Sequence, residues 1–197
     1  MARQEGPMAA RQFDGERLDL STLGHVTELS VNTIRKADLK RLRGLDALPL
    51  EALALRWLSA SDLTVVPMPP GLRALRLWHS SKVKTLDGIE QAPGLMALDL
   101  RELGQPLDLL AVAGLRDLRR LSVQGGYGAG QRIVSLAPLS GLPIEDLTLM
   151  AVDGADLDLG PVTRMRALRK LTLTGTKLDP AGMAAIKAAH AWFELDA

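Results

Sequence analysis

Histidine is the side chain best suited to hold a metal ion or to move a proton near neutral pH, so the three histidines are the first candidates for chemistry. His25, His79 and His190 lie far apart, and none has a carboxylate or a second histidine at metal-ligand spacing. The chain has no cysteine, which excludes thiolate zinc sites and a cysteine nucleophile, and no Ser/His/Asp set is recognisable. We therefore expect structural, solvent-facing histidines, no catalytic residue, no metal and no cofactor.

A glycine-rich stretch, QGGYGAG, follows a predicted strand, as the glycines of a phosphate-binding loop do. Its glycines, Gly125, Gly126, Gly128 and Gly130, do not match G-x-G-x-x-G, and no Gly-Lys-Ser/Thr follows them. The next residues, IVSLAPL, do not open a helix that would aim backbone N–H groups at a phosphate. We interpret the stretch as an enlarged loop, with Tyr127 at its tip either as a contact residue or merely exposed.

Tryptophan and arginine side by side are typical of protein-interaction hot spots. Trp57 and Trp78 fall at outward positions at the ends of predicted strands, among charged residues, which favours a binding face over the alternative in which both rings fold back onto Leu58 and Leu103. An aromatic platform could also stack a sugar, so small-ligand or glycan binding on this patch is the second hypothesis. The candidate partner-binding residues are Arg56, Trp57, Arg76, Trp78, His79, Asp99, Arg101 and Glu102.

These residues are positioned by a unit that recurs along almost the whole chain. Its clearest copy is LRKLTLTGTKL, which has the form L-x-x-L-x-L-x-x-T-x-L, and its middle leucine returns at intervals of 22 to 26 residues. Apolar residues alternate with mostly polar ones within each unit, which predicts a strand. A constant period of this length predicts stacked coils whose strands pair in parallel and whose leucines form internal columns. The middle leucines are Leu29, Leu53, Leu75, Leu98, Leu121, Leu147, Leu171 and Leu195.

The unit resembles the consensus of the leucine-rich-repeat family, and LAPLSGLPIEDLTL resembles the short repeats of bacterial internalins. The resemblance implies an α/β solenoid: a right-handed coil with a parallel β-sheet on its concave face and 3₁₀, short-helix or extended returns. Pro67, Pro69 and Pro70 favour an extended return in the third unit. The family usually carries asparagine three positions after the last strand leucine. No asparagine stands there in this chain, so we expect the turns to bond among themselves or to Ser80 and Thr176.

The same pattern sets the domain boundaries. Residues 1–15 are polar and without period, which predicts a flexible tail, and residues 16–197 form a single leucine-rich-repeat domain of about seven repeats. Residues 16–31 are expected to cover the open end of the stack as an N-terminal cap. Residues 179–197 are expected to form a helix, with Asp179 as its N-cap, from about Pro180 to His190 and then an edge strand around Leu195.

The composition and the absence of long apolar runs argue against several kinds of partner. The net charge is +1, with 24 basic and 23 acidic residues, which argues against nucleic acid as the partner. No signal peptide and no apolar run of about 18 to 20 residues is present, so we expect a cytoplasmic protein without membrane contact. The abundance of Ala, Leu, Arg and Gly looks bacterial. The resemblance therefore implies a non-enzymatic protein–protein interaction module that binds another protein on its concave face, such as a bacterial regulator or immunity protein.

Overall fold

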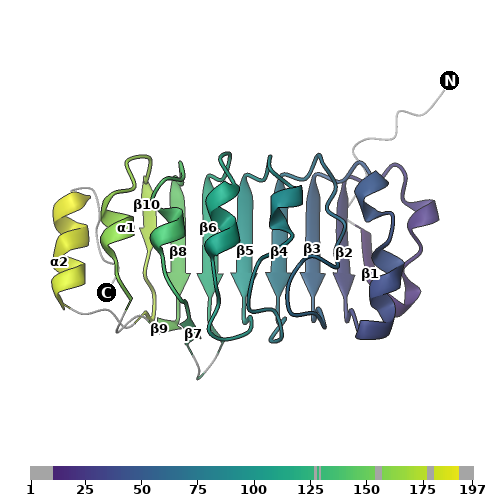
Figure 1. Cartoon of the computed structure of the whole chain (residues 1–197), viewed down its shortest axis with the longest axis horizontal. Helices are drawn as coiled ribbons and strands as arrows, with labels where there is room; N and C mark the ends of the chain where they lie inside the picture. Colours follow the sequence, from purple (N-terminus) through teal and green to yellow (C-terminus); the bar gives the residue numbers. More distant parts are fainter. Residues whose placement is uncertain (1–10, 127, 129, 154–156, 177–179, 191–197) are drawn as a thin grey trace.

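The computed structural model describes residues 11–126, 128, 130–153, 157–176 and 180–190. One strand from each successive coil enters a parallel eight-stranded sheet in chain order, and the return segments cover one side of it (Figure 1). The predicted solenoid is therefore confirmed. The strands of this sheet are β1 (Arg11–Asp14), β2 (Glu28–Asn32), β3 (Ala52–Arg56), β4 (Ala74–Trp78), β5 (Ala97–Arg101), β6 (Arg120–Gln124), β8 (Asp146–Met150) and β10 (Lys170–Thr172).

The strands pair without any register shift, so equivalent residues of successive coils lie side by side. Leu75 pairs with Leu98, and the same column continues through Leu121 and Leu147, all of them buried. Burying each such leucine stabilises the fold by about 1.5–3 kcal/mol relative to exposure. Because side chains alternate along a strand, the residues between the leucines must point away from this core. We call the surface that they form the sheet face.

The return segments are short and mostly 3₁₀-helical, as the three-residue spacing of their leucines requires. The proline-rich return at residues 62–71 contains no helix, as predicted. Its turn is held by Asp62, and the hydrogen bonds from the hydroxyl groups of Thr64 and Ser61 lower the pKa of that carboxyl. The helical segments of the returns are η1 (Gly15–Arg17), η2 (Leu20–Thr22), η3 (Lys36–Leu42), η4 (Leu45–Ala47), η5 (Ile89–Gln91), η6 (Leu110–Gly114), η7 (Ala137–Leu139) and α1 (Gly160–Thr163).

The N-terminal boundary differs from the prediction. Residues 11–14 were expected in a flexible tail, but they form β1, which pairs in parallel with β2 and extends the sheet by one strand. Only Phe13 of RQFD is half-buried, and a single apolar residue among three exposed ones does not predict a strand. Residues 1–10 lie outside the described residues.

At the other end, α2 (Pro180–Ala189) agrees with the predicted helix. Its predicted N-cap, Asp179, and the predicted edge strand around Leu195 lie outside the described residues. Across the described ranges, no helix is long and apolar enough to cross a membrane.

The glycine-rich loop leads into a strand rather than a helix. Its last glycine precedes β7 (Gln131–Arg132), which pairs in parallel with β9 (Val152–Asp153) at the edge where the main strands end (Figure 1). A Cβ atom on Gly125 would come within 2.2 Å of the carbonyl oxygen of Ala151, so the loop packs against the next coil only because this residue has no side chain. Gly125, at the start of the enlarged loop, therefore packs directly against the backbone of the next coil.

Side chains replace the missing asparagines at three turns. The Ser80 hydroxyl accepts a hydrogen bond from the N–H of Leu58 at 3.0 Å and donates to the carbonyl of Trp78, and Thr176 bonds Val152 and Leu149 in the same way. Both were predicted. The third is Gln131, a buried glutamine whose amide oxygen accepts from the N–H of Leu103 at 3.1 Å.

Candidate functional site

An arginine, a tryptophan and a second arginine lie in one row across three neighbouring strands. Arg56 of β3 pairs with Trp78 of β4, which pairs with Arg101 of β5. The two guanidinium carbons lie 4.3 Å and 4.6 Å from the centroid of the Trp78 ring, within the range of cation–π attraction. Each arginine is therefore held over the indole before any partner is present, and we call these three residues the Arg–Trp–Arg row.

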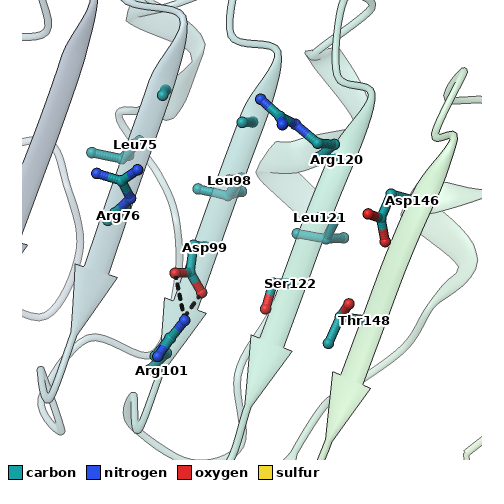
Figure 2. A pocket seen from close by; sticks show the side chains of 12 residues that line it. Leu75, Arg76, Leu98, Asp99, Arg101, Arg120, Leu121, Ser122, Asp146 and Thr148 are labelled. Carbon is teal, nitrogen blue, oxygen red and sulfur yellow. Dashed lines mark hydrogen bonds and ion pairs between the residues drawn. The ribbon is translucent and has the colours of Figure 1, made fainter. Parts of the chain in front are cut away.

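Asp99 fixes the row from the middle of β5. Its Oδ2 accepts a hydrogen bond from Trp78 Nε1 at 3.0 Å and lies 3.2 Å from Arg101 Nη2. Its Oδ1 accepts from Arg101 Nε at 3.2 Å (Figure 2). Three donors thus converge on one carboxylate, which orients the indole and one guanidinium and leaves the aspartate fully engaged.

A second row of side chains lies at the rim, where the strands end. Trp57, His79 and Glu102 each follow the last residue of a strand and each adopts a positive φ of 51° to 52°. The backbone N–H of each donates to a carbonyl group of the next coil, which supports this left-handed conformation in these three coils. The shared conformation aims the three side chains in parallel, and we call them the rim row.

The rim row is linked by direct contacts. The rings of Trp57 and His79 stack with centroids 5.4 Å apart, and His79 Nδ1 lies 2.9 Å from Glu102 Oε2. Trp57 is 50% exposed, and Trp78 is also partly exposed within its row. Neither tryptophan is therefore sealed beneath the rim, as the alternative with Leu58 and Leu103 required.

All eight predicted residues come together, because they occupy equivalent positions of three adjacent coils. Five of them line a hollow of about 520 Å³ at the rim, and Trp57 joins them by stacking on His79. Arg76 and Asp99 line a second hollow of about 270 Å³ farther along the strands, to which Arg101 also contributes (Figure 2). Both hollows extend beyond the prediction, onto β6 and β8. The lining residues that sequence reasoning missed include Arg120, Ser122, Gln124, Asp146, Thr148 and Met150.

The other histidines do not join this site. His25 is exposed in an N-terminal turn, whereas His190 is buried, with its Nε2 3.0 Å from the carbonyl oxygen of Val162. The prediction that all three histidines face solvent is therefore wrong for His190, which links α2 to α1. Among the residues that the structure describes, no group of three His, Asp or Glu side chains is placed to hold a metal ion.

Comparisons with known proteins agree with this architecture. No family model and no curated protein sequence matches the chain. Among solved structures, internalin C2 from Listeria monocytogenes is 16% identical, with a TM-score of 0.54 over 82% of this chain and 66% of that one. A second Listeria monocytogenes internalin is 15% identical, with a TM-score of 0.39 over 85% and 67% of the two chains.

A leucine-rich-repeat protein from Leptospira interrogans is also 15% identical, with a TM-score of 0.46 over 85% of this chain and 54% of its own. The chain thus spans between 54% and 67% of the lengths of these proteins. At such identities the likeness concerns the fold. The recurring leucine unit, the parallel sheet and the match to internalin C2 together identify this protein as a leucine-rich-repeat solenoid.

Proposed function

We propose that this protein is a non-enzymatic binding module that holds a partner protein on its sheet face. The observation that carries the proposal is the Arg–Trp–Arg row, in which Asp99 fixes Trp78 and Arg101 and the indole holds Arg56 on the same surface. Tryptophan and arginine dominate the binding energy of many protein interfaces. Side chains that are ordered before binding also lose less conformational entropy when the partner arrives.

The shape of the surface supports a macromolecular partner. The two hollows share Arg101, so they lie side by side on the sheet face across neighbouring strands. Trp57, which is 50% exposed, stands beside them in the rim row, stacked on His79. A protein surface could contact the floor and the rim together, as in interfaces that surround a central anchor with less critical contacts.

Glycan binding has less support at the centre of the patch. A sugar stacks on the open π face of an aromatic ring, but the Trp78 ring carries a guanidinium group from each of the two flanking strands. Trp57 is the more accessible platform, yet its ring already stacks on His79. A thermal-shift screen against glycans tests this second candidate, and a single sugar that raises the melting midpoint would favour it.

The cellular role belongs to the same proposal. A module of this kind would act in the cytoplasm, as a regulator or as an immunity protein that masks a toxin, without binding nucleic acid or a membrane. Support for this comes from composition and from analogy of architecture.

The test is the capture of partner proteins from native extract on immobilised protein, comparing the normal chain with the triple variant Arg56→Ala, Trp78→Ala, Arg101→Ala. Matched controls are Arg116→Ala, in the turn before β6, and Leu110→Ala, in which an exposed leucine of η6 is truncated. We expect the triple variant to lose at least one protein that both controls retain. Equal recovery by the triple variant and the normal chain would refute the proposal.

A further inference from the structure

Two arginines of the smaller hollow form no ion pair with any residue that the structure describes. Arg76 of β4 and Arg120 of β6 are both exposed and both line the hollow of about 270 Å³ (Figure 2). Within the described part of the chain, neither guanidinium group makes a hydrogen bond or an ion pair. Their charge therefore faces the solvent across a depression in the sheet face.

The two aspartates that face Arg76 and Arg120 across the strands form ion pairs with other residues. Asp99, opposite Arg76, is engaged by Trp78 and Arg101, and Asp146, opposite Arg120, lies 3.6 Å from Lys170. The lining of the hollow carries three arginines and two aspartates, a net charge of +1, and Lys170 beside Asp146 adds one more positive charge.

The space between the two arginines is open. Arg120 pairs across the strands with Ala97, which pairs with Ala74. Because these alanines carry only methyl groups, no long side chain fills the space beside Arg120. β4 and β6 are separated by β5 alone, so the two arginines stand about 9 to 10 Å apart in the direction across the strands. Figure 2 shows the Arg120 side chain extending from β6 toward β5. Ser122 and Thr148 add two hydroxyl groups to the lining.

We infer that this hollow binds a carboxylate side chain of the partner protein, with Arg76 and Arg120 as the guanidinium donors, so that the partner presents an acidic segment to the sheet face. The inference rests on the proposed function and names the chemistry of the partner. A guanidinium group matches a carboxylate with two parallel hydrogen bonds. The hydroxyl groups of Ser122 and Thr148 can donate to the same anion, that of Ser122 while it accepts from Gln124.

A carboxylate fits better than a run of phosphates. Asp99, which pairs with Ser122, and Asp146, which pairs with Arg120, line the same hollow, and they would repel a polyanion that extends over the face. The whole chain carries a net charge of only +1, so it offers no long-range attraction for nucleic acid. A discrete acidic side chain carries a single charge, so it meets less repulsion from the two aspartates than a polyanion does.

The test uses a fluorescein-labelled dodecapeptide of alternating glutamate and glycine as the probe, with binding followed by fluorescence anisotropy at about 50 mM salt. We expect saturable binding that weakens with added salt. We also expect it to weaken about tenfold or more in the double variant Arg76→Ala, Arg120→Ala, because most of the attraction comes from these two charges. Arg116→Ala removes an exposed arginine outside the sheet face and should leave the affinity unchanged.

Three results would overturn the inference: no saturable binding of the acidic peptide, equal affinity in the double variant, or tighter binding of an alternating lysine–glycine peptide. Tighter binding of oligothymidylate, lost in the same double variant, would assign the hollow to polyphosphate instead. Capture from extract separates this inference from the proposed function. If partners are lost from the Arg–Trp–Arg variant but retained by Arg76→Ala, Arg120→Ala, the binding face stands and the acidic partner is refuted.

Discussion

The buried glutamine that joins two coils allows a quantitative prediction. Gln131 is 1% exposed, its amide oxygen accepts from the N–H of Leu103, and its amide nitrogen donates to the carbonyls of Gly104 and Arg132. The substitution Gln131→Met keeps the length of the side chain and removes all three hydrogen bonds. The Arg132 carbonyl retains a second donor, the N–H of Leu107, so two backbone groups are left without their partner.

Leaving a buried donor or acceptor unsatisfied costs about 1–3 kcal/mol, so we expect Gln131→Met to lower the free energy of unfolding by about 2–6 kcal/mol. The measurement is urea unfolding followed by circular dichroism, with the midpoint and the slope both fitted. Gln124→Met is the matched control, because Gln124 is half-buried on the sheet face and donates only to the Ser122 hydroxyl. It should change stability by less than about 0.5 kcal/mol. A loss below that value for Gln131→Met, or equal losses for the two variants, would refute the reasoning.

Two further predictions concern the core and the backbone. Leu98→Ala, in the middle of a leucine column, should lower the free energy of unfolding by about 3–5 kcal/mol in the same urea assay. Leu171 is 7% exposed on the last strand of the sheet, so Leu171→Ala should lower it by only about 2 kcal/mol. Equal losses would contradict the stacking argument. Ala151→Gly should raise stability by up to about 1 kcal/mol, because Ala151 has a φ of 48°, which glycine adopts without strain. Ala97→Gly, in the middle of the sheet, should lower stability by about 0.5–1 kcal/mol. If both variants shift the melting midpoint in the same direction in a thermal melt, backbone strain at Ala151 is refuted.

The coil architecture could be predicted because one physical requirement is repeated in every unit. A leucine at each inward strand position can be buried only if the next coil supplies another, so a period near 24 residues fixes the sheet, the register and the buried columns together. The side-chain partners at Ser80 and Thr176 were also predictable, since both residues stand where the family carries asparagine. Gln131 was missed because it stands five residues after Gly126, which occupies the position where the family carries asparagine. The glycine-rich loop separates the two.

The candidate site was predictable as a group of residues but not as a set of contacts. Outward strand positions place Arg56, Trp78 and Arg101 in one row, which the register confirms. The contact of His79 with Glu102 could not be predicted, because it joins residues 23 positions apart, and the left-handed conformation that aims them is rare for glutamate. The contribution of β6 and β8 was also missed, since serine, threonine and an isolated arginine carry no distinctive pattern.

The pairing of equivalent residues makes the order of the coils part of the binding chemistry. If the unit containing β4 were removed as a whole, Leu53 would meet Leu98 and the interior would close again with the same kind of side chain. On the outside, however, the deletion would bring Arg56 next to Arg101, two like charges without the indole that now separates them. The gain or loss of whole repeats during evolution would thus preserve the solenoid but change which partner the sheet face recognises.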